Sequence, residues 1–244
     1  MVAKPLTVSL DQQIAEIPGL LSKPTSLLLD EFGAGNASPG SGSASALMGL
    51  LAIKLLMTVC RKSLAKPKLQ DKKMQFQFIL EKLNTIEPQL QSLFQKDADE
   101  FDEVVKVRIR RDAAEKSTEK AQLTTQANAL LEVATDNAFA ITDLSLQLID
   151  LGIVAFREGW AHVRGDSGSA ISVAVSGAMS GIFIANLNLK TLSTRNYARE
   201  NMNRCNDLIS DLQQKQSRVF ACVAAINSEA TEAIQSDLQL KLEF

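Results

Sequence analysis

The sequence is poor in aromatic rings, cysteine and histidine. Aromatic residues make up 5% of the 244 residues, and there are three cysteines and one histidine. The core must therefore come from Leu, Ile, Val and Ala, which a hydrophobic content of 45% supplies. Cys60, Cys205 and Cys222 lie far apart without a CxxC spacing. This pattern argues against a structural zinc site and predicts free thiols in a reducing compartment, so we expect a cytoplasmic protein.

A basic excess and a signal peptide are also missing. The formal net charge is −2 and the pI is about 5.6, and no isolated basic stripe occurs, so we predict no nucleic-acid partner. Residues 1–20 carry Lys4, Asp11 and Glu16 in place of the apolar run of a secretory signal.

A long apolar run is nearly absent. The one membrane candidate in the sequence is residues 46–60, which is shorter than the roughly 20 residues that span a bilayer and is interrupted by Lys54. We therefore expect a buried helix here and no membrane contact.

Glycine and proline are missing over long distances. No glycine occurs between Gly49 and Gly152, and no proline follows Pro88. Since these residues are the commonest helix breakers, their absence predicts long helices. Apolar residues also recur at steps of three and four, the spacing of one helix face, at Phe76, Leu80, Leu83, Ile86, Leu90 and Phe94.

These patterns predict an all-α protein, an elongated bundle of about five long helices. The expected spans are 43–65, 70–116, 118–157, 168–190 and 194–240, with a short leading helix at 24–34 and a kink at Pro88. The helix at 168–190 is rich in small residues and should pack closely on its neighbours. The last helix is amphipathic and strongly charged, so it either lies on the bundle surface or pairs with a second subunit. We expect an N-terminal extension at residues 1–24 and one helical domain at 25–244.

What is most distinctive is a loop of small residues that runs into an apolar helix, "NASPGSGSASALMGLLAIKLLMTVC" at 36–60. Gly40 and Gly42 permit unusual backbone angles and let a ligand approach the main chain. Ser41 or Ser43 can cap the helix, whose free N–H groups favour an anion or a polar ligand edge. The alternative is a loop that needs only tight geometry and a cap. No Gly-Lys-Ser/Thr follows, so the loop is not a P-loop.

Three stretches in order resemble the cyclodeaminase/cyclohydrolase family of tetrahydrofolate enzymes. They are "LLLDEFGAGNASPGSGSASALMGLLAIKLLMTVC", "QKDADEFDEVV" and "REGWAHVRGDSGSAISVAVSGAMSGIFIANLNLKTL", and the resemblance covers roughly residues 25 to 200. The positions that match the family pattern are Asp30, Pro39, Gly40, Gly42, Asp97, Phe101, Asp166, Gly168 and Asn188.

The sequence departs from the family pattern in four places. Ser41 replaces the middle glycine of the loop, and a Gly-Asn-x-Asn segment is replaced by Gly159, Trp160, Ala161 and His162. Ala138 stands where a proline is usual, and "KVRIRRDAA" replaces a Leu-Pro-Lys segment. These departures leave the fold intact but bear on activity.

The resemblance implies two functions. One is a folate one-carbon enzyme that hydrolyses methenyltetrahydrofolate to formyltetrahydrofolate, or cyclises formiminotetrahydrofolate with loss of ammonia. The other is a catalytically degenerate member that binds folate or a protein. It also implies a homodimer that takes a tetrahydrofolate derivative as substrate or ligand, with no tightly bound cofactor and no metal.

Proton transfer near the one-carbon unit requires an acid or base. Asp166 is the leading candidate, because it falls in a predicted Gly-flanked loop at 157–169; alternatively it only caps the next helix. Asp97 is the second candidate, or one charge of a solvated acidic face. His162, the only histidine, is either a group that titrates near neutral pH or a surface residue.

The expected substrate-binding residues complete the predicted site. Lys66 and Lys68 either receive the glutamate tail of a folate or are ordinary loop lysines. We expect the loops 38–43 and 159–168 to meet at one end of the bundle with Asp97. The substrate-binding set is Asp30, Gly40, Ser41, Gly42, Ser43, Lys66, Gly168 and Asn188.

Overall fold

The computed structural model describes residues 19–242, and all secondary structure in this part of the chain is helical. Its elements are η1 (Leu20–Ser22), α2 (Thr25–Gly33), α3 (Ser41–Leu64), η2 (Pro67–Lys72), α4 (Lys73–Ala113), α5 (Ser117–Glu158), η3 (Ala161–Val163), α6 (Arg164–Thr191) and α7 (Asn196–Leu242). The all-α prediction is confirmed, and α4 runs through Pro88 as one helix. The proposed extension at residues 1–24 lies mostly outside the described residues.

The predicted helix boundaries hold to within a few residues except at one place. The sequence predicted a loop at 157–169, whereas α5 continues to Glu158 and α6 already begins at Arg164. Gly165 was predicted in this loop and Gly168 at the start of the following helix, whereas both lie in the first two turns of α6, because packing outweighs the low helix propensity of glycine.

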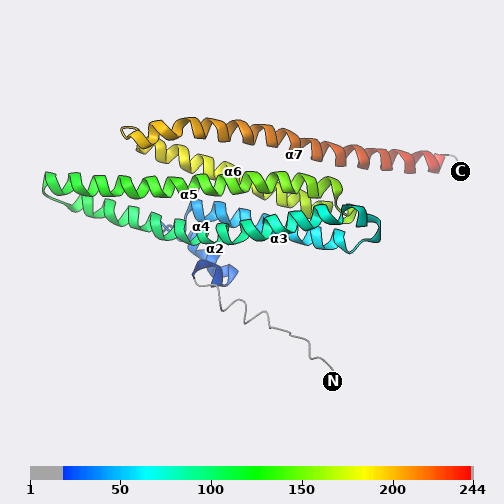
Figure 1. The fold of residues 1–244 in the computed structure, drawn as a ribbon, viewed down its shortest axis with the longest axis horizontal. Helices are drawn as coiled ribbons and strands as arrows, with labels where there is room; N and C mark the ends of the chain where they lie inside the picture. Colours follow the sequence, from blue (N-terminus) through cyan, green and yellow to red (C-terminus); the bar gives the residue numbers. More distant parts are fainter. Residues whose placement is uncertain (1–18, 243–244) are drawn as a thin grey trace, which may run out of the picture.

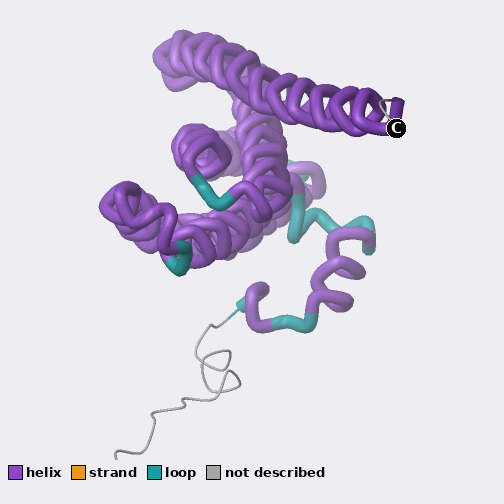
Figure 2. Tube along the Cα trace, turned by 90° about the vertical axis from the view of Figure 1, so that its right-hand side faces the viewer, coloured by secondary structure: helices purple, strands orange, loops and turns teal. Residues whose placement is uncertain are grey.

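Four helices, α3 to α6, form the elongated bundle, and α7 lies along α5 and α6 (Figure 1). Short connections join consecutive helices, so neighbours along the chain run antiparallel. Viewed from the end, the C-terminal part of α7 stands clear of the bundle (Figure 2).

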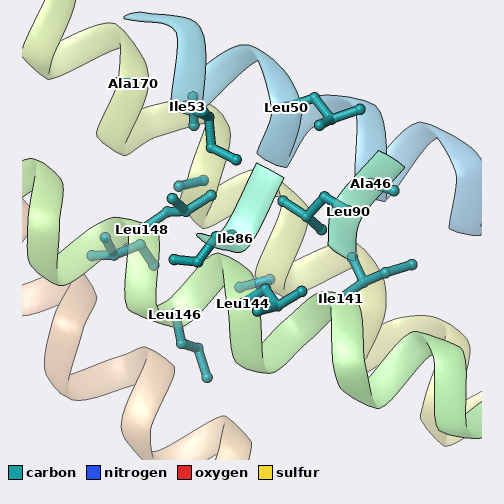
Figure 3. Close-up of a cluster of buried hydrophobic side chains, with 14 of the residues drawn as sticks. Ala46, Leu50, Ile53, Ile86, Leu90, Ile141, Leu144, Leu146, Leu148 and Ala170 are labelled. Atoms are coloured by element: carbon teal, nitrogen blue, oxygen red, sulfur yellow. The ribbon is translucent and has the colours of Figure 1, made fainter. Parts of the chain in front are cut away.

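The core is aliphatic, as the composition predicts, with Phe76, Phe94 and Phe139 as its fully buried rings. Figure 3 shows side chains of α3, α4 and α5 gathered between the helices, among them Leu50, Ile53, Ile86, Leu90, Ile141 and Leu148. Burying one such side chain contributes about 1.5–3 kcal/mol.

Small residues bring α6 close to its neighbours. A Cβ atom at Gly181 would lie 2.2 Å from the hydroxyl oxygen of Thr142 on α5, so only glycine fits there. The hydroxyl of Ser45 on α3 donates to the carbonyl of Gly177, at 2.7 Å. The predicted close packing of this helix is confirmed.

Three helices are long and apolar enough to cross a membrane by length and composition, in the segments Ser41–Leu64, Ser117–Glu158 and Ala161–Thr191. The expectation of a single candidate was wrong, because α5 and α6 also contain long windows with few charges. Inside the bundle these apolar windows are 61%, 67% and 44% buried, respectively. The predicted burial of residues 46–60 is confirmed, since Ile53 and Leu56 are fully inaccessible.

Candidate functional site

A cavity of about 210 Å³ lies at the N-terminal end of α3. Four helices and the loop before α3 contribute to its wall. Its lining residues are Ala37, Gly40, Ser41, Gly42, Asp97, Phe101, Ala134, Ile184 and Asn188. The structure therefore brings together seven positions that match the family pattern or belong to the predicted loop, and the other two are Ala134 and Ile184.

Asp97 of α4 is the charged group of this cavity. Its residue surface is only 7% exposed, and the hydroxyl of Ser43 donates to its Oδ2 at 3.0 Å. Burial raises the pKa of the Asp97 carboxyl above its ordinary value; hydrogen bonds from the Ser43 hydroxyl and main-chain N–H oppose this rise, and the nearby Glu100 adds to it. The alternative of a solvated acidic face is excluded for Asp97 itself.

The Asp97 carboxylate also lies at the N-terminal end of α3. The N-cap residue is Gly40, and no side chain caps the helix locally, so the predicted capping by Ser41 or Ser43 is wrong. The Ser43 N–H, one of the free donors of the first turn, instead meets a carboxylate from another helix. The positive end of the α3 dipole also favours a negative charge at this place.

Gly42 is required by this contact. A Cβ atom at position 42 would lie 1.9 Å from Oδ1 of Asp97, far inside van der Waals contact. The glycine lets the carboxylate approach the main chain of α3. Ser41, at the position where the family pattern has a glycine, is exposed at the rim of the cavity.

Asn188 of α6 presents an unused donor. Its side-chain nitrogen is buried and has no hydrogen-bond partner within residues 19–242, and the residue lines the cavity. An unsatisfied buried polar group costs about 1–3 kcal/mol, which an acceptor atom of a ligand would remove. The cavity thus combines a buried carboxylate with a free amide donor.

Asp166 is not part of this cavity. It lies in the first turn of α6, where the helix dipole stabilises its negative charge. The N-cap residue of α6 is Val163, and no side chain forms a capping hydrogen bond there. Asp166 and Asn188 are 22 residues apart on one helix, which is about 33 Å at a rise of ~1.5 Å per residue. Gly168 instead lines a separate apolar cavity between α6 and α7.

Lys66, Trp160 and His162 gather at the opposite end of α3. The Lys66 amine lies 3.5 Å from the Trp160 ring centroid, and the Trp160 and His162 rings stack at 4.7 Å. The Trp160 N–H donates to the hydroxyl of Ser63 at 2.9 Å. Ser63 and Gly42 are 21 residues apart on α3, or about 32 Å.

The predicted meeting of loops 38–43 and 159–168 is therefore wrong within one chain. The two loops precede helices that run in opposite directions, so they lie at opposite ends of the bundle. Asp30 also lies away from the cavity, on an exposed position of α2.

Sequence reasoning missed Ala134 of α5 and Ile184 of α6 as cavity walls. Both stand in apolar helical segments, where no signal distinguishes a cavity wall from the core. For a metal, the described residues offer no group of three or more His, Cys, Asp or Glu side chains.

Comparison with known proteins agrees with this architecture. The family model described as Formiminotransferase-cyclodeaminase matches residues 24–207. A methenyltetrahydrofolate cyclohydrolase from Methylorubrum extorquens is 26% identical over 196 residues, covering 80% of this chain and 93% of that protein. The crystal structure of formiminotetrahydrofolate cyclodeaminase from Thermotoga maritima has the same fold, with a TM-score of 0.71 at 16% identity, over 84% of this chain and 97% of that one. Because the family model spans most of the sequence, the chain belongs to the formiminotransferase-cyclodeaminase family.

Proposed function

We propose that this protein is a folate-dependent one-carbon enzyme. It hydrolyses methenyltetrahydrofolate to formyltetrahydrofolate, or cyclises formiminotetrahydrofolate with loss of ammonia. Family membership and the cyclohydrolase relative support the substrate class. The observation that carries the proposal is the cavity that pairs buried Asp97 with the free amide of Asn188.

In the hydrolytic direction, a water molecule attacks the methenyl carbon and transfers a proton to the Asp97 carboxylate. A carbon–oxygen bond forms, and Asp97 returns its proton to one ring nitrogen as the bond from that nitrogen to the one-carbon unit breaks. The formyl group remains on the other nitrogen, and the second proton of the water leaves to solvent as the formyl carbonyl forms. The raised pKa of Asp97 makes it a stronger base than an ordinary carboxylate. The Asn188 amide donates to the oxygen that develops on the one-carbon unit.

In the cyclising direction, a folate nitrogen attacks the formimino carbon, and the bond from that carbon to the leaving nitrogen breaks. Asp97 accepts the proton of the attacking nitrogen and returns it to the departing ammonia. One carboxyl group serves both steps, because its pKa is raised toward the working pH.

The size of the cavity limits what enters it. A volume of about 210 Å³ is below the roughly 300–1,000 Å³ of pockets that enclose a whole small ligand. The one-carbon unit therefore lies at the cavity, against Gly40, Ser41 and Gly42, and the larger parts of the folate on either side of this unit lie outside. Lys66 of the same chain is too remote to receive the tail.

The rest of the proposal concerns assembly and location. We propose a cytoplasmic homodimer formed from one helical domain, residues 25–244, with an extension at 1–24. It acts without a tightly bound cofactor, nucleic acid or membrane. The buried free thiols of Cys60, Cys205 and Cys222 support a reducing compartment.

The alternative is a catalytically degenerate member that binds folate or a protein. This alternative depends on Trp160 and His162, which replace the two asparagines of the family pattern. Both residues lie at the other end of α3 from the cavity. Only Ser41 among the replaced residues lines the cavity.

The experiment is to incubate the purified protein with methenyltetrahydrofolate and, separately, with formiminotetrahydrofolate. Absorbance follows the methenyl group in both reactions, and released ammonia is measured in the second. Conversion of either compound, abolished in Asp97→Asn, supports the enzyme. Folate binding without conversion of either compound supports the degenerate alternative.

A further inference from the structure

A cavity of about 470 Å³ lies between the start of α6 and the second half of α7. Helix α7 runs back along α6, so that residues 219–229 lie beside the first turns of α6 (Figure 1). The volume falls within the roughly 300–1,000 Å³ of pockets that take a small ligand. The family model ends at residue 207, so the α7 wall lies outside the matched domain. The apolar walls are formed by Phe156, Ile171, Val219, Val223 and Ile226.

Arg164 is the cation of this cavity, and two contacts hold its guanidinium group in place. Its Nη1 donates to both carboxylate oxygens of Glu229, at 2.8 and 2.7 Å. The guanidinium carbon lies 5.6 Å from the centroid of the Phe156 ring. The Nε atom, in contrast, is buried and has no hydrogen-bond partner within residues 19–242. A buried donor without an acceptor is unfavourable, so a ligand oxygen beside Nε would be stabilised.

The charges around this free donor favour an uncharged acceptor. The positive charge of Arg164 is already paired with Glu229, and Asp166 adds a second carboxylate in the first turn of α6. A ligand carboxylate at Nε would lie close to the Glu229 carboxylate, and like charges repel. A carbonyl oxygen accepts the same hydrogen bond without that repulsion. The apolar walls fit the hydrocarbon part of such a molecule.

Two glycines keep the cavity open on the α6 side. A Cβ atom at Gly165 or Gly168 would meet nothing within 4 Å, whereas a Cβ atom at Gly181 of the same helix would lie 2.2 Å from Thr142. Close packing therefore explains the glycine at 181 but not those at 165 and 168. Both of the latter line the cavity, and a larger side chain at either position would occupy the space of a ligand.

We propose that this cavity is a second ligand site, which binds an uncharged apolar molecule through one carbonyl oxygen. The oxygen accepts a hydrogen bond from Nε of Arg164, and the hydrocarbon part lies against Phe156 and Ile171. This site is remote from the proposed folate cavity, because Gly168 and Asn188 are 20 residues apart on α6, which is about 30 Å. The assignment does not depend on folate turnover.

The direct test titrates the purified full chain with three probes of nearly the same shape, followed by nuclear magnetic resonance of the probe. Acetophenone carries a carbonyl oxygen, α-methylstyrene has a CH2 group in its place, and benzoate carries a charged carboxylate. We expect saturable binding of acetophenone with a dissociation constant of about 1 mM or below, a modest value for a ligand of this size. Benzoate should bind more weakly than acetophenone.

The hydrogen bond is tested with Arg164→Lys. Lysine keeps a positive charge beside Glu229 but has no donor in the place of Nε. Acetophenone should therefore bind about tenfold more weakly to this variant, the usual scale of a hydrogen bond to a charged group. The affinity for α-methylstyrene should not change, because it makes no such bond. An equal loss for both probes, or no loss for acetophenone, would contradict the role of Nε.

The location is tested with Gly168→Leu, which fills the cavity from α6 and should abolish binding of acetophenone. The matched control is Ser169→Leu, at the next, exposed position of α6, which should bind as the wild-type protein does. Ile226→Trp fills the cavity from α7 and gives the same test if Gly168→Leu does not fold, as circular dichroism would show.

Three results overturn the proposal: no saturable binding of acetophenone to the wild-type protein, binding kept in the filled variants, or tighter binding of benzoate than of acetophenone. The failure of the folate proposal is seen separately, as the absence of folate conversion by a protein that still binds acetophenone.

Discussion

The two ends of α3 each carry a serine that meets another part of the chain, but the chemistry at the two ends differs. Each end meets a loop with a glycine and contacts a serine of α3, Ser43 at one end and Ser63 at the other. At the first end, Ser43 donates to a buried carboxylate. At the second, Ser63 accepts from the main chain of Trp160, and the aromatic rings cover the loop.

The difference lies in unused bonding capacity. At the Asp97 end, a carboxylate is buried with no cation among the groups that shift its pKa, and the side-chain nitrogen of Asn188 has no hydrogen-bond partner among the described residues. At the Trp160 end, Lys66 lies over the indole ring and remains in contact with solvent. A ligand gains binding energy at the first end, because it satisfies groups that the fold leaves unsatisfied. At the second end the Trp160 N–H, the Lys66 amine and the His162 ring already have partners within the chain, which is typical of a structural contact.

The largest expected effect separates the two aspartates. Asp97→Asn should lower turnover about 10²–10⁴-fold with folate affinity nearly kept, because the amide keeps the shape but cannot accept the proton. Asp166→Asn is the matched control at the remote end of α6, and its kcat should stay within about twofold of wild type, since a first-turn charge is worth only ~0.3–1 kcal/mol of helix stability. Steady-state kinetics with methenyltetrahydrofolate measures both; equal losses in the two variants would contradict the assignment.

The next comparison uses two glycines. Gly42→Ala places a methyl group against Asp97 and should destabilise the fold by about 1–3 kcal/mol while lowering activity, because the carboxylate must move. Gly168→Ala meets nothing within 4 Å and should stabilise α6 by up to about 1 kcal/mol. Urea unfolding measures both changes. A harmless Gly42→Ala would show that the close approach is not needed.

The pH dependence of stability provides a third test. The pKa of Asp97 is raised in the folded protein, so the folded state holds the proton of this carboxyl more tightly than the unfolded state, whose pKa is about 3.9. The free energy of unfolding is therefore highest below that unfolded pKa and falls as pH rises through the raised folded pKa. At neutral pH, Asp97→Asn should therefore melt at a higher temperature than wild type. The difference should vanish in acid, where both side chains are neutral. A variant that is less stable than wild type at pH 8 would show that the hydrogen bonds of the carboxylate outweigh its burial.

The smallest effect is expected at the Trp160 end. Trp160→Ala removes the contact with Lys66, the stack on His162 and the packing of a half-buried ring against the core, and should cost about 1–2 kcal/mol of stability. Turnover should not change, and restoring the family asparagines at 160 and 162 should not raise it. Thermal melts and kinetics of the two variants check this, and a gain of activity in Trp160→Asn with His162→Asn would return that loop to the site.

Much of the fold could be predicted, because its causes are local. The lack of Gly and Pro and the spacing of Phe76 to Phe94 indicate long helices without any tertiary information. The prediction that the Gly42 loop and Asp97 lie at the same end of the bundle is also confirmed, since both line one cavity. Their chemical link through Ser43 could not be predicted, because it joins residues 54 positions apart in sequence.

The misplacement of Asp166 has a topological reason. Successive helices of the bundle alternate in direction, so the starts of α3 and α6 point to opposite ends. The start of α3 meets the end of α6, which is where Asn188 lies. Small residues occur at the N-terminal ends of both α3 and α6. The order and direction of the helices decide which helix ends lie together in one site.

The main-chain N–H of Ser43, whose interaction with Asp97 lowers the pKa of that carboxyl, gives the protein an internal reporter. That amide proton faces the carboxylate whose charge changes during the proposed reaction. Its nuclear magnetic resonance frequency should therefore follow the ionisation of Asp97 as pH is varied, in the intact protein and without any label near the cavity. A folate that changes the protonation of the carboxylate would shift the same resonance, so the state of the reacting group becomes visible from the backbone of the neighbouring helix.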